Sequence, residues 1–488
     1  MQSREMAREM RPGFTIKEVK KATGAICAGE EATRRLPESV SGVSIDSRTV
    51  RPGELFVALR GAAHDGHEFV WECLARGASA ALVSSEWLSA LGPEELSRPL
   101  LSVRDTLWAF QELGRYNRIR VNPKVVAVTG SNGKTTTKEM IAAVSLTTYR
   151  TARTQGNLNN QFGVPITLLQ LQQGDEVAVV EMGMNRPGEI GRLAALSMPS
   201  VGVITNASAA HLEGMGTVLD VAKAKSELAD ELDRDDWLVI HRDSEELYRL
   251  NCERHVRLIT FGMSPQSDLC PSSVRYLGME GTELRVDGFP AVRIQLLGKQ
   301  NVLNALAALA ASRALGVTAE KAAAALALVK PTRGRMEMKA IGPASFIDDT
   351  YNANPGSMEM ALDTLFALDG FARKIAVLGD MLELGETADK WHFELGRSAA
   401  RADLLILYGE FADAVRRGAE ASGMRPDSIF AASSHSEIAE RVLSFWARGD
   451  LFLVKGSRGV AMEKVIEEVE SRENDGSSAR PTASKKGS

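Results

Sequence analysis

The chain has 488 residues, which is too long for one hydrophobic core and natural for roughly two to four domains. Its hydrophobic fraction of 44% and charged fraction of 25% are typical of soluble globular proteins. A formal net charge of −5 excludes a strong overall attraction to nucleic acid or to acidic membranes, so we expect no nucleic-acid partner.

We expect neither a secretory signal nor a disulfide framework. No apolar run approaches the roughly 20 residues that span a bilayer, and the start, MQSREMAREMRPG, lacks the apolar centre of a secretory signal. The four cysteines (Cys27, Cys73, Cys252 and Cys270) are scattered without a CxxC pair. We therefore expect a cytoplasmic protein with free thiols and no membrane insertion.

The first block of the chain, residues 1–122, mixes short strand-like segments with helical ones. Its strand-like segments are SGVSIDSR, GELFVAL and AALVSS. The block ends in the polar stretch RIRVNPK, where Pro123 indicates a joint between domains.

The second block, residues 123–332, alternates Val/Ile runs with helical segments. The predicted strands are VVAVTG, EVAVVEMG, VGVITNA and WLVIH. Near-continuous apolar strands between helices are buried on both faces, which indicates a parallel sheet. Four short segments between residues 256 and 298 are predicted to be antiparallel strands: RLITFG, VRYLG, ELRVDG and VRIQLLG. The Ala/Leu-rich stretch 301–315 is predicted to be a helix.

The third block, residues 333–470, alternates in the same way. Its predicted strands are SFIDDTY, KIAVLGDM, LLILYG, SIFAA and LFLVKGSRG, with helices between them. We predict an α/β protein of three domains: a mixed α/β N-terminal domain, a central P-loop mononucleotide-binding domain with a parallel sheet, and a C-terminal Rossmann-like domain. The polar, Ser-rich end, residues 471–488, is predicted to be disordered.

The stretch KVVAVTGSNGKTTTKEM, residues 124–140, indicates a nucleotide site. A strand that ends in TGSNGKTT and leads into a helix presents backbone N–H groups to an anion. Lys134 would reach the β- and γ-phosphates, and the Thr135 hydroxyl would hold Mg²⁺. Val128 stands where the usual G-x-x-x-x-G-K-[ST] pattern has its first glycine, which argues against a generic motor or GTPase loop but not against a nucleotide. The alternative is a Gly-rich turn with a surface lysine.

Two further residues follow strands at the same predicted sheet edge. Glu181 ends the strand EVAVVEMG, and a carboxylate there is a natural magnesium ligand beside a phosphate loop. His211 follows the next strand, so we predict that it lies near the loop and Glu181 as a ligand. Without the loop, a solvated carboxylate and a structural histidine would be the simpler interpretations.

Lys225 interrupts the apolar face of the predicted helix VLDVAKAKSELADEL. Lys223 lies on the opposite, charged face, whereas Lys225 lies in the middle of the apolar stripe. Burying an unpaired ammonium is costly. The residue is therefore either a stem that reaches out to water or a lysine of lowered pKa that can be modified or can bind an anion.

These motifs together resemble the Mur ligase family, whose members use ATP to join amino acids or peptides to a UDP-sugar. The loop T-G-x-x-G-K-T without the first glycine is typical of that family. The segments TGSNGKTTTKEM, GNLNNQFGVP, HLEGMGT, DDTYNANP, LGDMLELG and VKGSRG resemble the member that adds D-alanyl-D-alanine. The resemblance extends from about Ile45 to Val465. An acidic residue is common in the family after NANP, where this chain has Gly356.

The resemblance implies ATP and Mg²⁺ as cofactors, with UDP-N-acetylmuramoyl-tripeptide and D-alanyl-D-alanine as partners of a cytoplasmic, monomeric enzyme of peptidoglycan synthesis. It implies an ATP site made of Thr129, Gly130, Ser131, Asn132, Gly133, Lys134, Thr135, Thr136, Asn301, Asn304, Arg335 and Asp349. It implies a metal site of Thr135, Glu181, His211 and Lys225, the last as a carbamate. It implies substrate contacts from Asp46, Ser47, Arg48, Asn157, Asn159, Asn160, Tyr351, Asn352, Asn354, Lys455 and Arg458. Lys134, Lys225, His211 and Arg335 are the implied catalytic residues.

The implied reaction is amide formation through an acyl phosphate. Three alternatives are a folylpolyglutamate-synthase-like ligase, a nucleotide-regulated binding protein without catalysis, and a small-molecule kinase. The SIDSR block argues against the first, because a folate ligase does not need a uridine-binding domain. The intact set of Lys134, Glu181, His211 and Lys225 argues against the second. A kinase would not need an amine acceptor. The third residue of the tripeptide, diaminopimelate or lysine, stays open.

Overall fold

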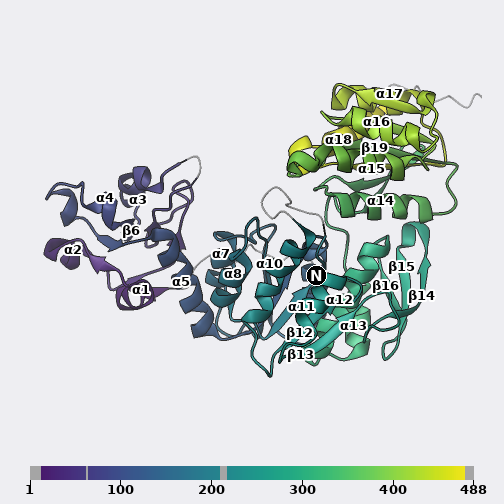
Figure 1. Cartoon of the computed structure of the whole chain (residues 1–488). Coiled ribbons are helices and arrows are strands. Elements are labelled where there is room, and N and C mark those ends of the chain that lie inside the picture. Colours follow the sequence, from purple (N-terminus) through teal and green to yellow (C-terminus); the bar gives the residue numbers. More distant parts are fainter. Residues whose placement is uncertain (1–12, 62–63, 209–216, 479–488) are drawn as a thin grey trace, which may run out of the picture.

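The computed structural model describes residues 13–61, 64–208 and 217–478. Figure 1 shows an elongated chain in which the N-terminal part lies at one end, the central part in the middle and the C-terminal part over the far end. Parallel sheets with helices around them recur along the chain. The predicted α/β class is therefore confirmed, whereas the residue boundaries of the three domains stay predictions.

The N-terminal part contains a sheet in the order β2-β7-β6-β5-β4, in which only β2 is antiparallel to its neighbour. Its strands are β2 (Ile26–Cys27), β4 (Val43–Ser44), β5 (Leu55–Val57), β6 (Ala80–Ser84) and β7 (Leu100–Val103). A separate antiparallel ladder joins β1 (Phe14–Thr15) to β3 (Ser39–Val40). The helices are α1 (Ile16–Thr23), α2 (Glu30–Arg35), α3 (Val70–Ala75), α4 (Ser85–Leu88) and α5 (Thr106–Val121). Helix α5 also contacts the central part and so connects the two.

The central part is built on a parallel sheet in the order β13-β12-β11-β8-β10-β9. Its strands are β8 (Lys124–Thr129), β9 (Thr151–Arg153), β10 (Val177–Glu181), β11 (Val201–Ile204), β12 (Trp237–His241) and β13 (Arg257–Phe261). Its helices are α6 (Lys134–Ser145), α7 (Gly163–Leu169), α8 (Glu189–Ser197), α10 (Val218–Asp230), α11 (Glu245–Asn251), α12 (Lys299–Leu315) and α13 (Ala319–Leu326).

Both faces of this sheet are covered, as the apolar strands predict. Val126 and Val128 pack into the core formed with α6, α12 and α13. Val125 and Ala127 belong to the core on the other face, which includes α8 and α10. All four side chains are fully buried, so β8 is held rigidly and its carboxyl end is a fixed platform for the loop that follows.

One prediction for residues 256–298 is wrong. The segment RLITFG forms β13, which is parallel to β12 and extends the central sheet. The other three segments do form an antiparallel sheet of β14 (Pro271–Tyr276), β15 (Thr282–Val286) and β16 (Val292–Ile294). Local composition does not distinguish the two outcomes, because pairing direction depends on which neighbour the strand reaches.

The C-terminal part is built on a sheet in the order β17-β18-β22-β19-β20-β21, in which only β17 is antiparallel. Its strands are β17 (Glu337–Ile341), β18 (Ala344–Asp349), β19 (Arg373–Gly379), β20 (Leu404–Tyr408), β21 (Ile429–Ala432) and β22 (Asp450–Lys455). Its helices are α14 (Pro355–Ala367), α15 (Ala388–Ala399), α16 (Ala412–Ala421), α17 (His435–Phe445) and α18 (Glu463–Ser478). Residues 471–478 are thus helical where the sequence predicts disorder, and residues 479–488 lie outside the described part.

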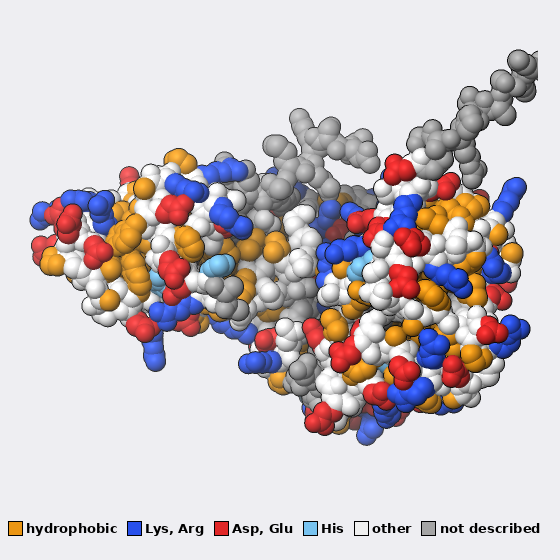
Figure 2. Space-filling model, turned by 90° about the horizontal axis from the view of Figure 1, so that it is seen from above, with side chains coloured by type: hydrophobic (Ala, Val, Ile, Leu, Met, Phe, Trp, Pro, Cys, Tyr) orange, Lys and Arg blue, Asp and Glu red, His pale blue; other side chains and the backbone are white. Residues whose placement is uncertain are grey.

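The surface carries both signs of charge. In Figure 2, Lys/Arg and Asp/Glu side chains are interspersed over the visible face, which agrees with the small net charge. No helix among the described residues is long and apolar enough to cross a membrane. All four cysteines are free thiols.

We expect Phe452→Ala to destabilise the C-terminal sheet by about 3–5 kcal/mol, because it removes a large buried ring and leaves a cavity. Phe452 is fully buried and stacks on Phe346 with ring centroids 4.7 Å apart. Hydrogen exchange of β18, β19 and β22 measures the change locally. Leu328→Ala is the control, since Leu328 is 76% exposed. Equal protection in Phe452→Ala and the parent would contradict the expectation.

Candidate active site

A tight loop connects β8 to α6, and its glycines are required by close packing. Gly133, with φ +81°, precedes the helix, and a Cβ there would collide with the side chains of Asn304 and Gln300. A Cβ on Gly130 would collide with Thr205. Val128 lies inside β8 and is buried, so this position belongs to the strand and not to the loop. That placement accounts for the absence of the first glycine of the usual pattern.

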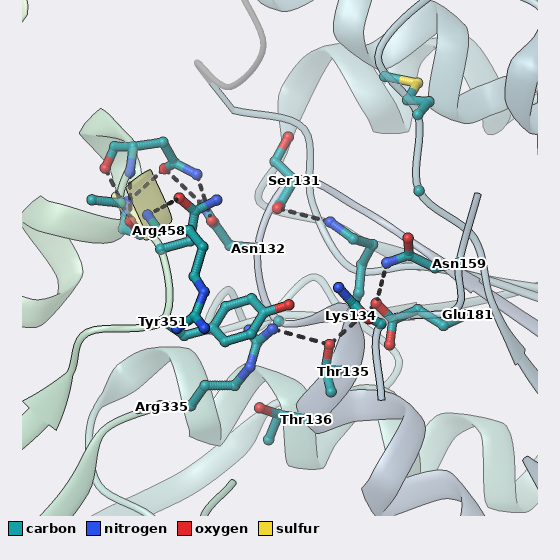
Figure 3. Close-up of a pocket in the computed structure, with 18 of the residues that line it drawn as sticks. Ser131, Asn132, Lys134, Thr135, Thr136, Asn159, Glu181, Arg335, Tyr351 and Arg458 are labelled. Atoms are coloured by element: carbon teal, nitrogen blue, oxygen red, sulfur yellow. Dashed lines mark hydrogen bonds between the residues drawn. The ribbon is translucent and has the colours of Figure 1, made fainter. Parts of the chain in front are cut away.

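The loop lysine and a carboxylate meet at the start of α6. The ammonium of Lys134 donates to the carbonyl oxygens of Gly130 (2.7 Å) and Ser131 (3.2 Å), so the side chain curls over the loop (Figure 3). Burial lowers the pKa of Lys134, the nearby Glu181 opposes that effect and Arg335 adds to it. A phosphate placed on the loop would give this cation a stronger acceptor than the two carbonyls.

Glu181, at the end of β10, is held by the neighbouring strands and by α6. Its Oε1 accepts hydrogen bonds from the Thr135 hydroxyl (3.1 Å) and from Asn159 Nδ2 (2.8 Å). Its backbone N–H donates to Thr154 Oγ1 (3.0 Å). The other carboxylate oxygen, Oε2, is buried and has no hydrogen-bond partner among the described residues. One side of the carboxylate is therefore fixed and the other remains free to bind a cation.

Arg335 brings the segment that follows the central part to the loop. Its Nη2 donates to Thr135 Oγ1 at 3.2 Å, and its guanidinium lies 4.0 Å from the centroid of the Tyr351 ring. Figure 3 shows Arg335 and Tyr351 opposite Lys134, with Arg458 on the same side as Tyr351. The arginine, the loop and the carboxylate therefore face the same space. Arg335 and Thr135, which are in contact, are 200 residues apart in the sequence.

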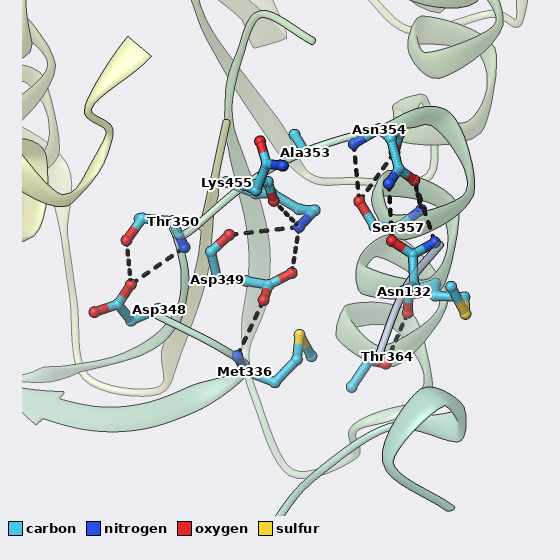
Figure 4. A network of polar contacts seen from close by, with 12 residues as sticks. Asn132, Met336, Asp348, Asp349, Thr350, Ala353, Asn354, Ser357, Thr364 and Lys455 are labelled. Carbon is cyan, nitrogen blue, oxygen red and sulfur yellow. Dashed lines mark hydrogen bonds and ion pairs between the residues drawn. The ribbon is translucent and has the colours of Figure 1, made fainter. Parts of the chain in front are cut away.

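A second link joins the loop to α14. Asn132 and Asn354 exchange side-chain hydrogen bonds of 3.3 and 2.8 Å (Figure 4). Asn354 also caps α14, where its side chain accepts the backbone N–H of Ser357. Gly356 lies beside Asn132 and Ser208, so a side chain at position 356 would face the phosphate loop.

Buried Lys455 and partly buried Asp349 form an ion pair at the carboxyl ends of β22 and β18. Lys455 Nζ lies 2.6 Å from Asp349 Oδ2 and also donates to the Asn352 carbonyl oxygen at 2.8 Å. The other carboxylate oxygen of Asp349 accepts the backbone N–H of Met336 at 3.1 Å. Met336 has φ +53°, so this bond fixes a strained turn directly after Arg335 (Figure 4). The pair thus sets the position of the arginine.

One cavity of about 630 Å³ joins these groups. It brings together most of the predicted site residues, namely Ser131, Asn132, Gly133, Lys134, Thr135, Thr136, Asn157, Asn159, Asn160, Glu181, Lys225, Asn301, Asn304, Arg335, Asp349, Tyr351, Asn352, Asn354, Lys455 and Arg458. Thr129 and Gly130 are not on its wall, although the Gly130 carbonyl contacts Lys134. The predicted ligand His211 lies outside the described residues.

Asp46, Ser47 and Arg48 are not part of this cavity. They follow β4 in the N-terminal part, where Arg48 makes a two-point contact with the Asp46 carboxylate at 2.9 and 2.7 Å. The side-chain bond to Arg48 lowers the pKa of Asp46. Arg76 binds the Ser47 carbonyl at 2.9 Å. The three residues thus form a separate polar turn.

The predicted asparagines differ in their engagement. Asn159 binds Glu181, whereas Asn160 Oδ1 accepts the backbone N–H groups of Phe162 and Gly163 at the start of α7. Asn304 Nδ2 donates to Asn301 Oδ1 at 3.0 Å, so these two form a linked pair on the buried side of α12. Asn160 therefore stabilises the turn before α7 and also lines the cavity.

Lys225 is buried, as the helix pattern predicts. It is 2% exposed on α10 and reaches the cavity, while Lys223 is exposed and pairs with Asp220. Among the described residues, none forms a hydrogen bond or an ion pair with the Lys225 ammonium. Burial lowers the pKa of Lys225 well below its ordinary value of 10.5, and the charge of Lys134 lowers it further. A neutral amine at this position is a nucleophile that can be modified.

The oxygen atoms beside the loop fit a magnesium ion. Mg²⁺ binds oxygen ligands, usually one or two from the protein, with phosphate and water supplying the others. Thr135 Oγ1 is an oxygen of this kind, and so is Glu181 Oε2, which accepts no hydrogen bond from the described residues. No group of three His, Cys, Asp or Glu side chains forms a metal cage in the described ranges.

Sequence reasoning missed several residues of the site. Lys138 is completely buried, one helical turn after Lys134. Its position among the apolar residues of α6 is a signal of the same kind as that of Lys225. Arg192 lines the cavity near the N-terminal part and binds Gln111 and Glu112 of α5. No local motif marks Arg192, because its partners come from a helix 80 residues earlier.

Comparisons with known proteins agree over nearly the whole chain. Residues 39–99, 128–312 and 334–458 match, in that order, the families described as "Mur ligase family, catalytic domain", "Mur ligase middle domain" and "Mur ligase, glutamate ligase domain". The UDP-N-acetylmuramoyl-tripeptide–D-alanyl-D-alanine ligase of Bacillus subtilis is 35% identical, with 88% of this chain and 93% of that protein covered.

Solved structures give the same result. A crystal structure of MurF from Acinetobacter baumannii has a TM-score of 0.85 and 30% identity, and the match covers 94% of this chain and 99% of that one. MurF ligase from Thermotoga maritima, solved in complex with ADP, has a TM-score of 0.79 and 28% identity, with 92% and 99% covered.

We expect Lys225→Met to raise the thermal stability of the nucleotide-free protein near pH 7. Because the pKa of Lys225 is lower in the folded state, the unfolded chain binds more protons in the window between that lowered pKa and 10.5. The stability of the parent should therefore rise with pH across that window, and Lys225→Met should remove this part of the slope. Melting curves from pH 7 to 10 test it, with the exposed Lys223→Met as control. Equal slopes in the parent and Lys225→Met would refute it.

Proposed function

The chain belongs to the Mur ligase family, and we propose that it is the member that joins D-alanyl-D-alanine to UDP-N-acetylmuramoyl-tripeptide with ATP in peptidoglycan synthesis. The main support for this proposal is that one cavity is lined by the phosphate loop, Glu181, Lys225 and Arg335. We further propose a cytoplasmic monomer whose domains extend over residues 1–122, 123–332 and 333–470.

The reaction must activate a carboxylate, which is a poor electrophile because its leaving group would be oxide. Transfer of the γ-phosphoryl group of ATP to the carboxylate gives an acyl phosphate, whose leaving group is phosphate. The amine of D-alanyl-D-alanine then attacks the carbonyl carbon, and the tetrahedral intermediate collapses with loss of phosphate. The residues of the cavity contribute mainly by position and charge.

Cations at the cavity reduce the repulsion between the carboxylate and the γ-phosphate. Lys134 is placed to leave its two carbonyl partners for phosphate oxygens, and Arg335 lies across the cavity beside Thr135. The Tyr351 ring, whose centroid lies 4.0 Å from the guanidinium carbon, stabilises that placement by a cation–π contact. These contacts would neutralise the transferring group from two sides.

Thr135 and Glu181 would hold Mg²⁺, together with His211 and a carbamylated Lys225. The bound ion would supply further positive charge at the phosphates. A carbamate would turn the buried amine of Lys225 into an oxygen ligand. This would explain why a lysine lies on the buried face of α10. Two observations support this assignment: Glu181 Oε2 accepts no hydrogen bond from the described residues, and the pKa of Lys225 is lowered.

The two substrates are proposed to contact different sets of residues. Asp46, Ser47 and Arg48 would bind the UDP end on the N-terminal part, and Asn157, Asn159 and Asn160 would face the muramoyl-peptide. Tyr351, Asn352, Asn354, Lys455 and Arg458 would surround the dipeptide. Thr129 to Thr136, Asn301, Asn304, Arg335 and Asp349 would bind ATP.

We expect Mg²⁺-ATP and UDP-N-acetylmuramoyl-tripeptide to give phosphate release that depends on D-alanyl-D-alanine, with UDP-pentapeptide appearing in equal amount by mass spectrometry. Tripeptides ending in diaminopimelate or in lysine should be compared, because the third residue is open. Dependence on another amino acid or on a folate would reject the proposed acceptor. Turnover without any amine would favour a kinase.

We expect Arg335→Met to lower kcat by about 10²- to 10³-fold, because one stabilising donor is lost from the transferring phosphoryl group. ATP binding, measured by calorimetry, should weaken far less than kcat falls, because the contact is strongest to the charge that develops in the transition state. Arg333→Met is the matched control, since Arg333 is exposed and pairs with Glu467 away from the cavity. A kcat in Arg335→Met close to that of Arg333→Met would contradict the role.

A further inference from the structure

A chain of charges lies behind the carboxylate that faces the phosphate loop. Lys138, on α6, is completely buried, and its ammonium is 2.7 Å from Glu139 Oε1. Glu139 in turn pairs with Arg153 at 2.9 Å. The same ammonium donates to the carbonyl oxygen of Thr154 at 2.9 Å. Burying a lysine this deeply is unfavourable unless its charge is compensated, so the arrangement needs a reason beyond packing.

The ammonium lies near Glu181 without bonding to it. Lys138 Nζ is 3.9 Å from Glu181 Oε2, which is outside hydrogen-bond distance. That oxygen has no hydrogen-bond partner among the described residues, although it is buried. Glu139 and the Thr154 carbonyl hold the ammonium at 2.7 and 2.9 Å, closer than Glu181 does. Lys138 is thus close enough to stabilise the carboxylate electrostatically and is kept from occupying its free oxygen.

Thr154 links this lysine to the backbone of Glu181. Its carbonyl accepts from Lys138, and its hydroxyl accepts the backbone N–H of Glu181. Lys138 therefore ties the first turns of α6 to the ends of β9 and β10. The same helix carries Thr135, whose hydroxyl binds the other oxygen of Glu181. The relative position of Thr135 and Glu181 depends on this tie.

We propose that Lys138 is a positioning residue: restrained by Glu139, it holds Glu181 beside Thr135 with one carboxylate oxygen free for the divalent cation that accompanies the nucleotide. The inference rests on the proposed function of Glu181 and Thr135 as cation ligands. Lys138 is not on the wall of the cavity, so it would act through Glu181. Groups that orient a metal ligand typically change metal affinity by about 10- to 100-fold when removed.

The test measures ADP binding by calorimetry in Mg²⁺ and in EDTA, and the ratio of the two affinities is the magnesium gain. Lys138→Met should keep the affinity in EDTA within about twofold of the parent and lose about 10- to 100-fold of the magnesium gain. Ser145→Ala, a buried polar change farther along α6, is the control and should leave the gain unchanged.

Glu139→Gln is the second variant. Because Glu139 is partly exposed, we expect this change to disturb folding less than a change at the buried Lys138. Without the Glu139 charge, Lys138 can move onto Glu181 Oε2 and compete with Mg²⁺, so the gain should also fall. In the double variant that combines Lys138→Met with Glu139→Gln, the second change should cause no further loss of the magnesium gain. No lysine then remains that could move onto Glu181 Oε2. A purely structural role of the charge chain predicts instead that the two losses add.

The outcomes separate the two proposals. If the parent shows no magnesium gain, the proposed cation site at Glu181 and Thr135 is wrong. If the parent shows a gain and Lys138→Met retains it, or binds Mg²⁺ more tightly, only the positioning role of Lys138 is overturned. Additive losses in the double variant would also overturn it.

Discussion

The hydrogen bond from Arg335 to the Thr135 hydroxyl is the contact on which the arrangement of the site depends. It joins the first turn of α6 to the segment that leads into the C-terminal sheet. A ligase that activates a carboxylate with ATP must bring two anions together, and their repulsion is reduced only if cations are fixed around them. Two of those cations come from distant parts of the chain, since Lys134 begins α6 and Arg335 directly precedes the strands of the C-terminal sheet. Contact between the central and C-terminal parts is therefore a condition of the chemistry.

The rest of the structure keeps that contact in place. The pair of Asp349 and Lys455 fixes the backbone of Met336, directly after the arginine, and the Asn132–Asn354 pair ties the loop to the start of α14. The strands beneath are buried on both faces and deform little. Rigid sheets thus support a site whose functional groups lie on loops and helix starts, which is the usual division in α/β enzymes.

Buried lysines are the unfavourable part of this design. Lys138 and Lys225 lie on helices that also carry the cores of the central sheet. Lys138 is compensated by Glu139, whereas Lys225 has a strongly lowered pKa. Each reduces the stability that an apolar side chain would give at the same position. The proposed functions would account for both residues, Lys138 as a group that positions Glu181 and Lys225 as an amine that can be modified.

The sequence by itself determined the α/β class, the phosphate loop and the burial of Lys225, because each follows from local order: a strand, a glycine turn and a helix, or a lysine at the wrong place in an apolar stripe. It did not determine the direction of β13, the helical state of residues 471–478 or the importance of Lys138 and Arg192. Those depend on which segments meet in space. Strand direction is set by the neighbour that the strand reaches, and the ends of helices are stabilised by packing as well as by propensity. The distances between Arg335 and Thr135, and between Lys138 and Glu181, exist only after the sheets have packed, so only the tertiary structure could assign them.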